Sequence, residues 1–160
     1  MTFREAVEAA PHPVNGAYHP GKRALENRHR NLVTCAEPRR LTGSIDLDSA
    51  LRQEPAHAQA PRWDYGLGYR ATNGPERAVW IEVHSATTKE VSAVLRKLQW
   101  LRDWLNGNAE QLGQMTNLTC SNIRFVWIAS SGVKIPPNSP QARRLNQSAI
   151  NRVRERLQLS

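Results

Sequence analysis

The feature that most constrains the fold is a long amphipathic helical pattern between two apolar segments that are typical of buried strands. The flanking segments are residues 78–84 (AVWIEVH) and 123–130 (IRFVWIAS). Thr87 or Thr88 can cap the helix, and its apolar residues recur at helical spacing: Val91, Val94, Leu95, Leu98, Leu101 and Leu105. A strand, a long helix and a second strand predict a parallel pair joined by a crossover.

A second pattern predicts a β-hairpin that ends in the first of these strands. Residues 62–70 (RWDYGLGYR) alternate, and residues 72–77 (TNGPER) are typical of a turn. The alternation predicts two faces, one with Trp63, Tyr65, Leu67 and Tyr69 and the other with Asp64, Gly66 and Gly68. The glycines indicate that other backbone or a ligand approaches their face closely.

The remaining segments complete an α/β prediction. Residues 3–10 and 22–33 are typical of helices, and residues 41–51 include a strand. A final helix is predicted over about 140–158, with Leu145, Ile150, Val153 and Leu157 facing inward. We therefore predict one domain over residues 1–160, with a core at about 22–130. Its centre is a mixed sheet of about four core strands, flanked by helices on both faces.

The composition favours an acidic partner. The chain of 160 residues has 22 Lys and Arg against 14 Asp and Glu, a formal net charge of +8. Nucleic acid is the first candidate, and the alternative is a basic surface that only keeps the protein soluble. The predicted nucleic-acid-binding residues are Lys22, Arg23, Arg28, Arg143, Arg144, Arg152 and Arg156. Arg152 and Arg156 are predicted to share a helical face, which is either a phosphate-binding surface or a solvated one.

Other function classes find little support. Cys35 and Cys120 lack the spacing of a metal-binding pair and are expected to be reduced thiols. The histidines lack zinc-ligand spacing, and the chain contains no Gly-rich phosphate loop and no Gly-x-Ser-x-Gly motif. With no apolar stretch long enough for a membrane span and no signal pattern, we expect a cytoplasmic protein without membrane contact.

Four acids lie on candidate strands, where an unpaired buried carboxylate is costly. These are Asp46, Asp48, Asp64 and Glu82. Asp64 and Glu82 belong to the two strands of the predicted hairpin, so their side chains can share a divalent cation such as Mg²⁺. The alternative is that each acid pairs with one of the many arginines.

The order of these elements and acids resembles the restriction-endonuclease-like PD-(D/E)xK nuclease superfamily over roughly residues 22–130. That resemblance implies metal-dependent phosphodiester hydrolysis, with Mg²⁺, or Mn²⁺ as a substitute, held by Asp64 and Glu82. It also implies a homodimer, since many nucleases of this fold cut two strands as pairs. Trp63 stands where the family name has proline, and His84 stands where the family has the lysine of Glu-x-Lys.

The departure at His84 leaves several interpretations open. In the family, the lysine orients or deprotonates the attacking water and offsets charge on the phosphate. His84 can take a proton near neutral pH or ligate the metal. Alternatively Lys97, at the edge of the helical stripe, supplies the missing cation; Lys89 fits less well. His84 can also be a structural residue bonded to Asp46 or Asp48. The predicted catalytic set is therefore Asp64, Glu82, His84 and Lys97.

Two alternative functions remain. One is a catalytically inactive module of the same fold that binds nucleic acid or a protein. The other is a metal-independent RNA endonuclease similar to the tRNA-splicing enzymes, which use a tyrosine, a histidine and a lysine. Its candidates are Tyr65 or Tyr69, His84, and Lys97 or Lys134. Trp100 and Trp104, four apart on the long helix, are either core residues, part of a dimer interface or base-stacking residues.

Overall fold

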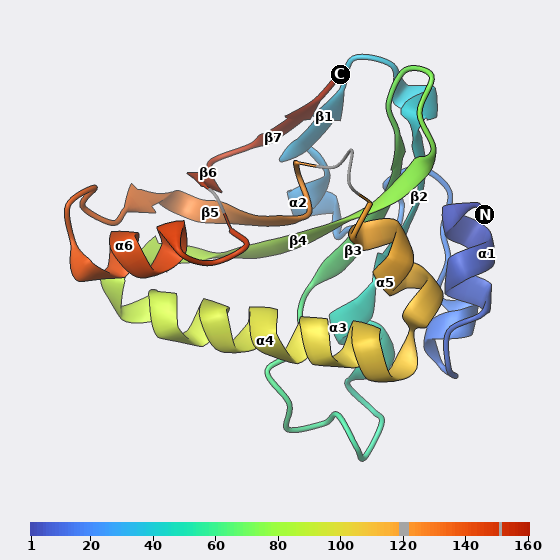
Figure 1. The fold of residues 1–160 in the computed structure, drawn as a ribbon, viewed down its shortest axis with the longest axis horizontal. Helices are drawn as coiled ribbons and strands as arrows, with labels where there is room; N and C mark the ends of the chain where they lie inside the picture. The colour runs from blue at the N-terminus through green and yellow to red at the C-terminus, as the bar shows by residue number, and fades with distance from the viewer. Residues whose placement is uncertain (119–121, 151) are drawn as a thin grey trace.

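A five-stranded mixed sheet forms the centre of the protein in the computed structural model, which describes residues 1–118, 122–150 and 152–160 (Figure 1). The strand order is β2-β3-β4-β5-β6. Neighbouring strands among β2, β3 and β4 are antiparallel, whereas β5 runs parallel to β4 and β6 parallel to β5. The strands are β2 (Leu41–Asp46), β3 (Tyr65–Arg70), β4 (Glu76–Thr87), β5 (Phe125–Lys134) and β6 (Val153–Arg154). The predicted α/β class and mixed sheet are therefore confirmed, with one strand more than expected.

The predicted hairpin is formed by β3 and β4, with pairs that run from Tyr65 opposite Ile81 to Arg70 opposite Glu76. The predicted close approach to its glycines is also confirmed, but the approaching groups are side chains. A Cβ atom on Gly66 would lie 2.7 Å from the Trp80 ring, and one on Gly68 would lie 2.6 Å from Phe3. The small residues therefore make room for aromatic packing on this face of the sheet.

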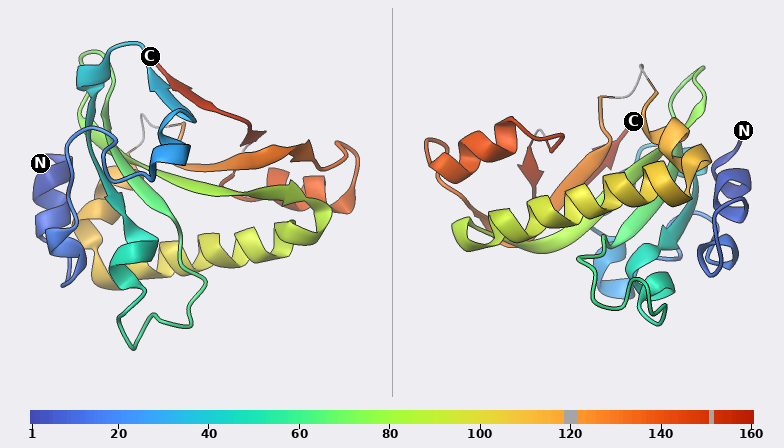
Figure 2. Two further views of the ribbon diagram at one scale, coloured as in Figure 1. Left: turned by 180° about the vertical axis from the view of Figure 1, so that it is seen from behind. Right: turned by 60° about the horizontal axis from the view of Figure 1, so that its bottom comes forward.

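Helices cover one face of the sheet (Figures 1 and 2). They are α1 (Phe3–Glu8), α4 (Val91–Asn108), α5 (Glu110–Thr116) and α6 (Pro140–Asn146). The long helix α4 is the predicted crossover between the parallel strands β4 and β5. Phe3 and Val7 of α1 are fully buried, so the core extends beyond the predicted range 22–130.

The beginning of α4 and its tryptophans differ in part from expectation. A short 3-10 helix, η3 (Thr88–Glu90), precedes α4, and neither Thr87 at its start nor Glu90 makes a side-chain capping hydrogen bond. Trp104 is buried and stacks on Trp100 with ring centroids 6.2 Å apart. Trp63 also packs in this core. The alternation predicted that Trp63 shares the face of Tyr65. This is wrong, because Trp63 precedes β3 and packs in the core on the other face.

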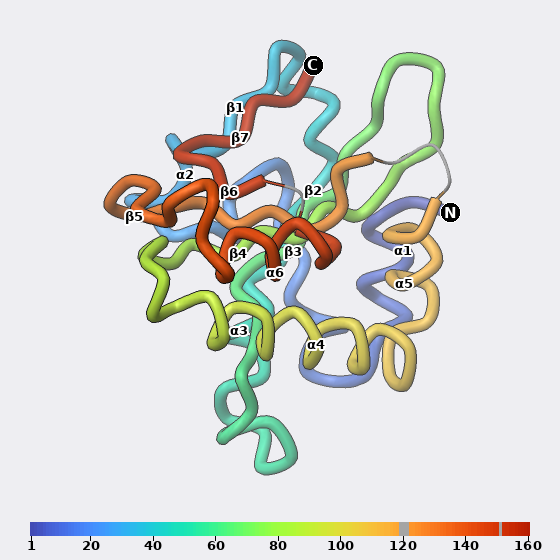
Figure 3. Tube along the Cα trace, turned by 60° about the vertical axis from the view of Figure 1, so that its left-hand side comes forward, coloured from blue at the N-terminus to red at the C-terminus, as the bar shows by residue number. Residues whose placement is uncertain are grey.

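A thin layer covers the other face of the sheet (Figure 3). It consists of a two-stranded parallel sheet of β1 (Val33–Cys35) and β7 (Leu157–Leu159), with the short helix α2 (Asn27–Arg30). Buried apolar residues join this layer to the sheet, among them Leu25, Val33, Leu67, Ile81, Val126, Ile128 and Leu157. Helices therefore cover the α4 face as predicted. The other face is covered by β1 and β7 with only the short helix α2. The remaining short elements are η1 (Val14–Gly16), η2 (Pro38–Arg40) and α3 (Leu47–Leu51).

The predicted C-terminal helix over about 140–158 is wrong. Helix α6 ends at Asn146, and the Ser148 hydroxyl then donates to the carbonyl of Leu145 at 2.6 Å and accepts from the Ile150 N–H at 3.0 Å. The chain continues as β6 and β7. These strands pair with β5 and β1, so backbone partners distant in sequence outweigh the helical spacing of apolar residues.

The predicted helix over 22–33 is reduced to the single turn of α2. The Lys22 ammonium group donates to the carbonyls of Arg30 and Val33, at 2.9 and 2.8 Å, and thereby holds this irregular segment together. Cys35 is a half-buried free thiol, and Cys120 lies outside the described residues. No helix in the described parts of the chain is long and apolar enough to cross a membrane.

Candidate active site

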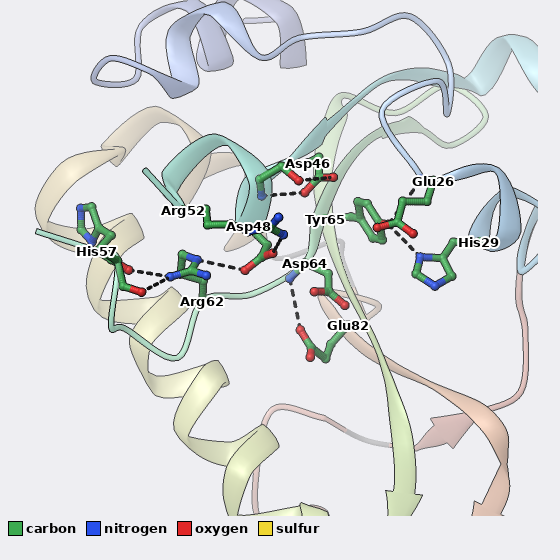
Figure 4. Close-up of polar contacts among 12 residues, drawn as sticks. Glu26, His29, Asp46, Asp48, Arg52, His57, Arg62, Asp64, Tyr65 and Glu82 are labelled. Atoms are coloured by element: carbon green, nitrogen blue, oxygen red, sulfur yellow. Dashed lines mark hydrogen bonds and ion pairs between the residues drawn. The ribbon is translucent and has the colours of Figure 1, made fainter. Parts of the chain in front are cut away.

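The hairpin brings Asp64 and Glu82 together. Asp64 immediately precedes β3, and the pairing of Tyr65 with Ile81 puts it opposite Glu82 on β4. The Asp64 N–H donates to Glu82 Oε1 at 3.1 Å (Figure 4). The Val83 N–H donates to Asp64 Oδ2 at 2.9 Å. Backbone N–H groups of β4 and of the residue before β3 therefore hold the two carboxyl groups next to each other.

Lys97 supplies the cation of this cluster. Its ammonium group donates to Glu82 Oε2, and its side chain is 22% exposed whereas that of Glu82 is 0% exposed. Trp80 and Ala78 on β4 pack in the core beneath α4. Because alternate residues of a strand share a face, Glu82 points toward the same helix. Lys97 therefore lies where the sequence predicted, next to the sheet.

Burial controls the protonation of this cluster. It raises the pKa of Glu82 to about 8, the negative charge of Asp64 adds to the effect, and Lys97 partly opposes it. Burial also raises the pKa of Asp64, although the Val83 N–H stabilises its charged form. Burial would lower the pKa of Lys97, but its attraction to Glu82 outweighs this and the pKa is raised. Two carboxyl groups thus share one lysine, and an added cation would favour their charged forms.

His84 borders the cluster without taking the predicted structural role. Its Nε2 lies 2.9 Å from Glu90 Oε2, and its Nδ1 lies 3.6 Å from Glu82 Oε2. The ring meets the Trp127 ring edge to face, with centroids 6.4 Å apart. The expected hydrogen bond to Asp46 or Asp48 is therefore wrong, since Glu90 is the partner. The contacts of His84 with Glu90 and Trp127 were not predicted from the sequence. The one signal for them was the position of Glu90 near the start of the long helix.

The other two acids that were predicted on strands have structural partners. The strand position predicted for Asp48 is wrong, because Asp48 lies in α3. Asp46 caps α3, accepting from the N–H and the hydroxyl group of Ser49, both at 2.9 Å. Asp48 is paired with Arg52 at 2.6 Å and with Arg62 at 2.9 Å. Burial alone would raise the pKa of Asp48, but the two arginines lower it. The alternative of arginine pairing thus holds for Asp48, whereas Glu82 pairs with a lysine.

A polar pocket of about 420 Å³ opens beside the cluster. Asp64 and His84 line it, whereas Glu82 is fully buried. Its other walls come from the α2 segment, the β2–α3 junction and the strands β3, β4 and β5: Glu26, Arg28, His29, Asp46, Asp48, Ser49, Arg52, Tyr65, Val83, Ser85 and Ser130. A second pocket of about 490 Å³, lined in part by Arg40 and Tyr69, contains none of the predicted catalytic residues. We therefore consider the pocket at Asp64 as the candidate active site.

Tyr65 was considered only for the metal-independent alternative, and the structure pairs it with His29, which the sequence did not single out. The Tyr65 hydroxyl lies 2.7 Å from His29 Nδ1. Burial raises the pKa of Tyr65, which disfavours it as a base. Tyr69 instead donates to the carbonyl of Ser160 and lies in the other pocket, and Lys134 ends β5 opposite Thr87. Tyr65 and His84 alone among these candidates line the pocket.

The predicted nucleic-acid-binding residues do not form one group. Arg28 lines the pocket and pairs with Glu26 at 2.8 Å. Lys22 is used in the fold, as described above. Arg143 and Arg144 are exposed on α6, and Arg144 also donates to the Ser92 hydroxyl at 2.8 Å.

Three further basic residues are exposed, namely Arg23, Arg152 and Arg156. The helical face predicted for Arg152 and Arg156 is wrong, because both flank the extended strand β6. The C-terminal arginines therefore do not form the regular row that a helix would present.

Comparisons with known proteins yield only short matches. No family model matches the chain, and no solved structure matches it. The chain is 33% identical over 51 residues to Peptidase B of Cronobacter sakazakii, and 37% identical over 54 residues to Peptidase B of Pectobacterium atrosepticum. These matches cover 32% and 34% of this chain and 12% of each peptidase. Such partial similarity shows no family for the chain.

Proposed function

We propose that the protein is a metal-dependent nuclease-like protein that acts on nucleic acid through Asp64, Glu82 and Lys97. The observation that carries this proposal is the buried ion pair between Lys97 and Glu82, beside the carboxyl group of Asp64. In the restriction-endonuclease-like family, the lysine follows the glutamate on the same strand. Here a lysine from the crossover helix α4 reaches the same glutamate, which supports a variant arrangement with the lysine moved.

The order of elements adds support. Asp64 stands at the start of β3, the second strand of the main sheet, and Glu82 lies on β4, the third. The crossover helix α4 and the parallel strand β5 follow, as in that family. The net charge of +8 suits a phosphate-rich partner.

The residues fit a divalent cation. Mg²⁺ is commonly bound by one or two carboxylates, with waters and substrate phosphates completing its shell. The described residues contain no group of three or more His, Cys, Asp or Glu that could hold a metal ion, which argues against a site made by protein ligands alone. Asp64 and Glu82 would hold the ion. Burial raises the pKa of both groups, and a bound cation would favour their charged forms. When bound, the ion would polarise a phosphoryl oxygen and acidify a water molecule.

The side chains of the chain then have distinct tasks. Lys97 favours the charged form of Glu82 and orients its carboxylate. Asp64 presents its carboxyl group to the pocket, where the phosphodiester enters. His84, held by Glu90 at 2.9 Å, can accept or donate a proton at the pocket wall.

A binding module without catalysis is the second candidate. The ion pair of Glu82 with Lys97 favours it, because this pair balances one carboxylate without a metal. In such a module, the basic surface would serve binding alone.

Plasmid nicking tests the proposal. With Mg²⁺ or Mn²⁺, we expect cleavage by the unaltered protein and by Asp103→Asn, an exposed acid on α4. Glu82→Ala is expected to abolish cleavage. If the unaltered protein binds DNA or RNA in a salt-dependent way but never cleaves it, the binding module is the correct function.

A further inference from the structure

We propose that His29 is a further substrate-binding residue, which donates its Nε2–H to a phosphate oxygen of a nucleic-acid strand in the pocket beside Asp64. Tyr65 is the positioning residue that holds the His29 ring. This inference rests on the proposed function, because it assigns part of the substrate contact at the same site.

The geometry joins His29 to the predicted metal-binding acid. His29 belongs to α2, and Tyr65 is the first residue of β3, directly after Asp64. His29 Nδ1 lies 2.7 Å from the Tyr65 hydroxyl oxygen, and the rings meet edge to face with centroids 5.7 Å apart. Both residues and Asp64 line the same pocket, as Figure 4 allows the reader to follow. The His29 ring is therefore held by the residue that directly follows Asp64.

The hydrogen bonds around Tyr65 allow His29 to carry its proton at Nε2. The Tyr65 hydroxyl oxygen accepts from the Glu26 N–H at 3.3 Å. In the proposed arrangement its own O–H donates to His29 Nδ1, 2.7 Å away. A neutral imidazole that accepts at Nδ1 has its proton at Nε2. A tyrosine hydroxyl is ordinarily protonated at neutral pH, so this donor is present there.

The pocket suits a phosphate better than a base. Most of the lining side chains that the structure describes are charged or carry a hydroxyl group, and the rings among them are those of Tyr65, His29 and His84. Arg28 and Arg52 also line the walls, paired with Glu26 and Asp48. Because Asp46 and Asp64 line the pocket too, a phosphate enters together with the divalent cation of the proposed function. Phosphate oxygens are acceptors that such N–H groups bind well. His29 therefore contributes an uncharged donor next to charged ones.

Fluorescence anisotropy with a labelled oligonucleotide tests this role at pH 8, where histidine is ordinarily neutral, with Ca²⁺ present to occupy the site of the divalent cation. We expect His29→Ala to weaken binding about tenfold, the effect of losing a hydrogen bond to a charged group. His29→Gln keeps a side-chain N–H donor and is expected to restore most of the affinity. Tyr65→Phe should weaken binding, whereas Tyr69→Phe, a buried tyrosine facing the other pocket, should not.

The salt dependence separates this donor from a cation. His29→Ala should leave the slope of log affinity against log salt unchanged, whereas Arg28→Ala should reduce it by about one. Wild-type affinity in His29→Ala, with circular dichroism showing a folded variant, would overturn the inference, as would a reduced slope. Failure of the unaltered protein to bind overturns both proposals. Binding without cleavage overturns only the nuclease, and the His29 variants still decide this inference.

Discussion

At the scale of single residues, Glu82 has the most unusual environment in the candidate active site. Its side chain is 0% exposed and touches a backbone N–H, a lysine and a neighbouring acid. A carboxylate in such a place is expensive to ionise, so a chain selected only for stability would favour a neutral residue. The cost is understandable if Glu82 has a chemical task.

Glu82 should make the folded protein less stable as the pH rises. Its pKa is raised from 4.5 to about 8, so without a bound cation the folded chain retains a proton that the unfolded chain releases between these values. The contact with Lys97 becomes an ion pair as that proton leaves. The free energy of unfolding therefore falls with pH in this window, by on the order of 1 kcal/mol per pH unit from this group. Asp64, whose pKa is also raised, acts in the same direction. Glu82→Gln should flatten the decline.

Urea denaturation from pH 5 to pH 8 measures this effect, with Asp103→Asn as a control that should follow the unaltered protein. Equal pH dependence in Glu82→Gln and the unaltered protein would contradict the account of Glu82.

At the scale of elements, local patterns predicted the parts of the fold that carry the candidate site. The alternation in β3, the apolar runs of β4 and β5 and the stripe of α4 each depend on residues close in sequence. The hairpin and crossover then bring Asp64, Glu82 and Lys97 together. The strands β6 and β7 and the contact of Tyr65 with His29 depend on distant segments. The spacing of residues within one segment gives no information on contacts with segments that are distant in the sequence.

Gly66 should be intolerant of a side chain. In Gly66→Ala, the new Cβ would lie 2.7 Å from the ring of Trp80, which is fully buried and cannot move freely. We expect a loss of about 1–3 kcal/mol in the free energy of unfolding, as for other overpacked cores. Gly107→Ala on α4 is the matched control. Nothing lies within 4 Å of its Cβ position, and the change should stabilise by about 0.5–1 kcal/mol. Denaturant unfolding that ranks the two variants in the opposite order would refute this packing argument.

At the scale of the whole molecule, the charge of +8 is spread over several elements. Some of the cations serve the fold, as Lys22 does for two carbonyl groups. Others, including Arg143 and Arg144, are exposed on α6. Only the exposed group is expected to contribute to phosphate binding at long range.

Substitution of the exposed arginines should change the salt dependence of nucleic-acid binding, whereas substitution of Lys22 should not. The double variant Arg143→Ala, Arg144→Ala should reduce the slope of log affinity against log salt by about 2, if each arginine neutralises one phosphate. Lys22→Met should leave the slope unchanged but lower the denaturation temperature, because two carbonyl groups lose their donor. A slope that the double variant leaves unaltered would exclude α6 from the binding surface.

The central claim is that Lys97, and not His84, is the cation that nucleic-acid cleavage requires, through its contact with Glu82. The most direct measurement compares Mg²⁺-dependent cleavage rates of the unaltered protein, Lys97→Met and His84→Ala on one nucleic-acid substrate. Lys97→Met keeps the apolar stem and removes the charge, and we predict a loss of at least about 100-fold, as for other groups that stabilise charge in phosphoryl or acyl transfer. His84→Ala should retain activity to within about tenfold. A large loss in His84→Ala together with normal cleavage by Lys97→Met would contradict the claim.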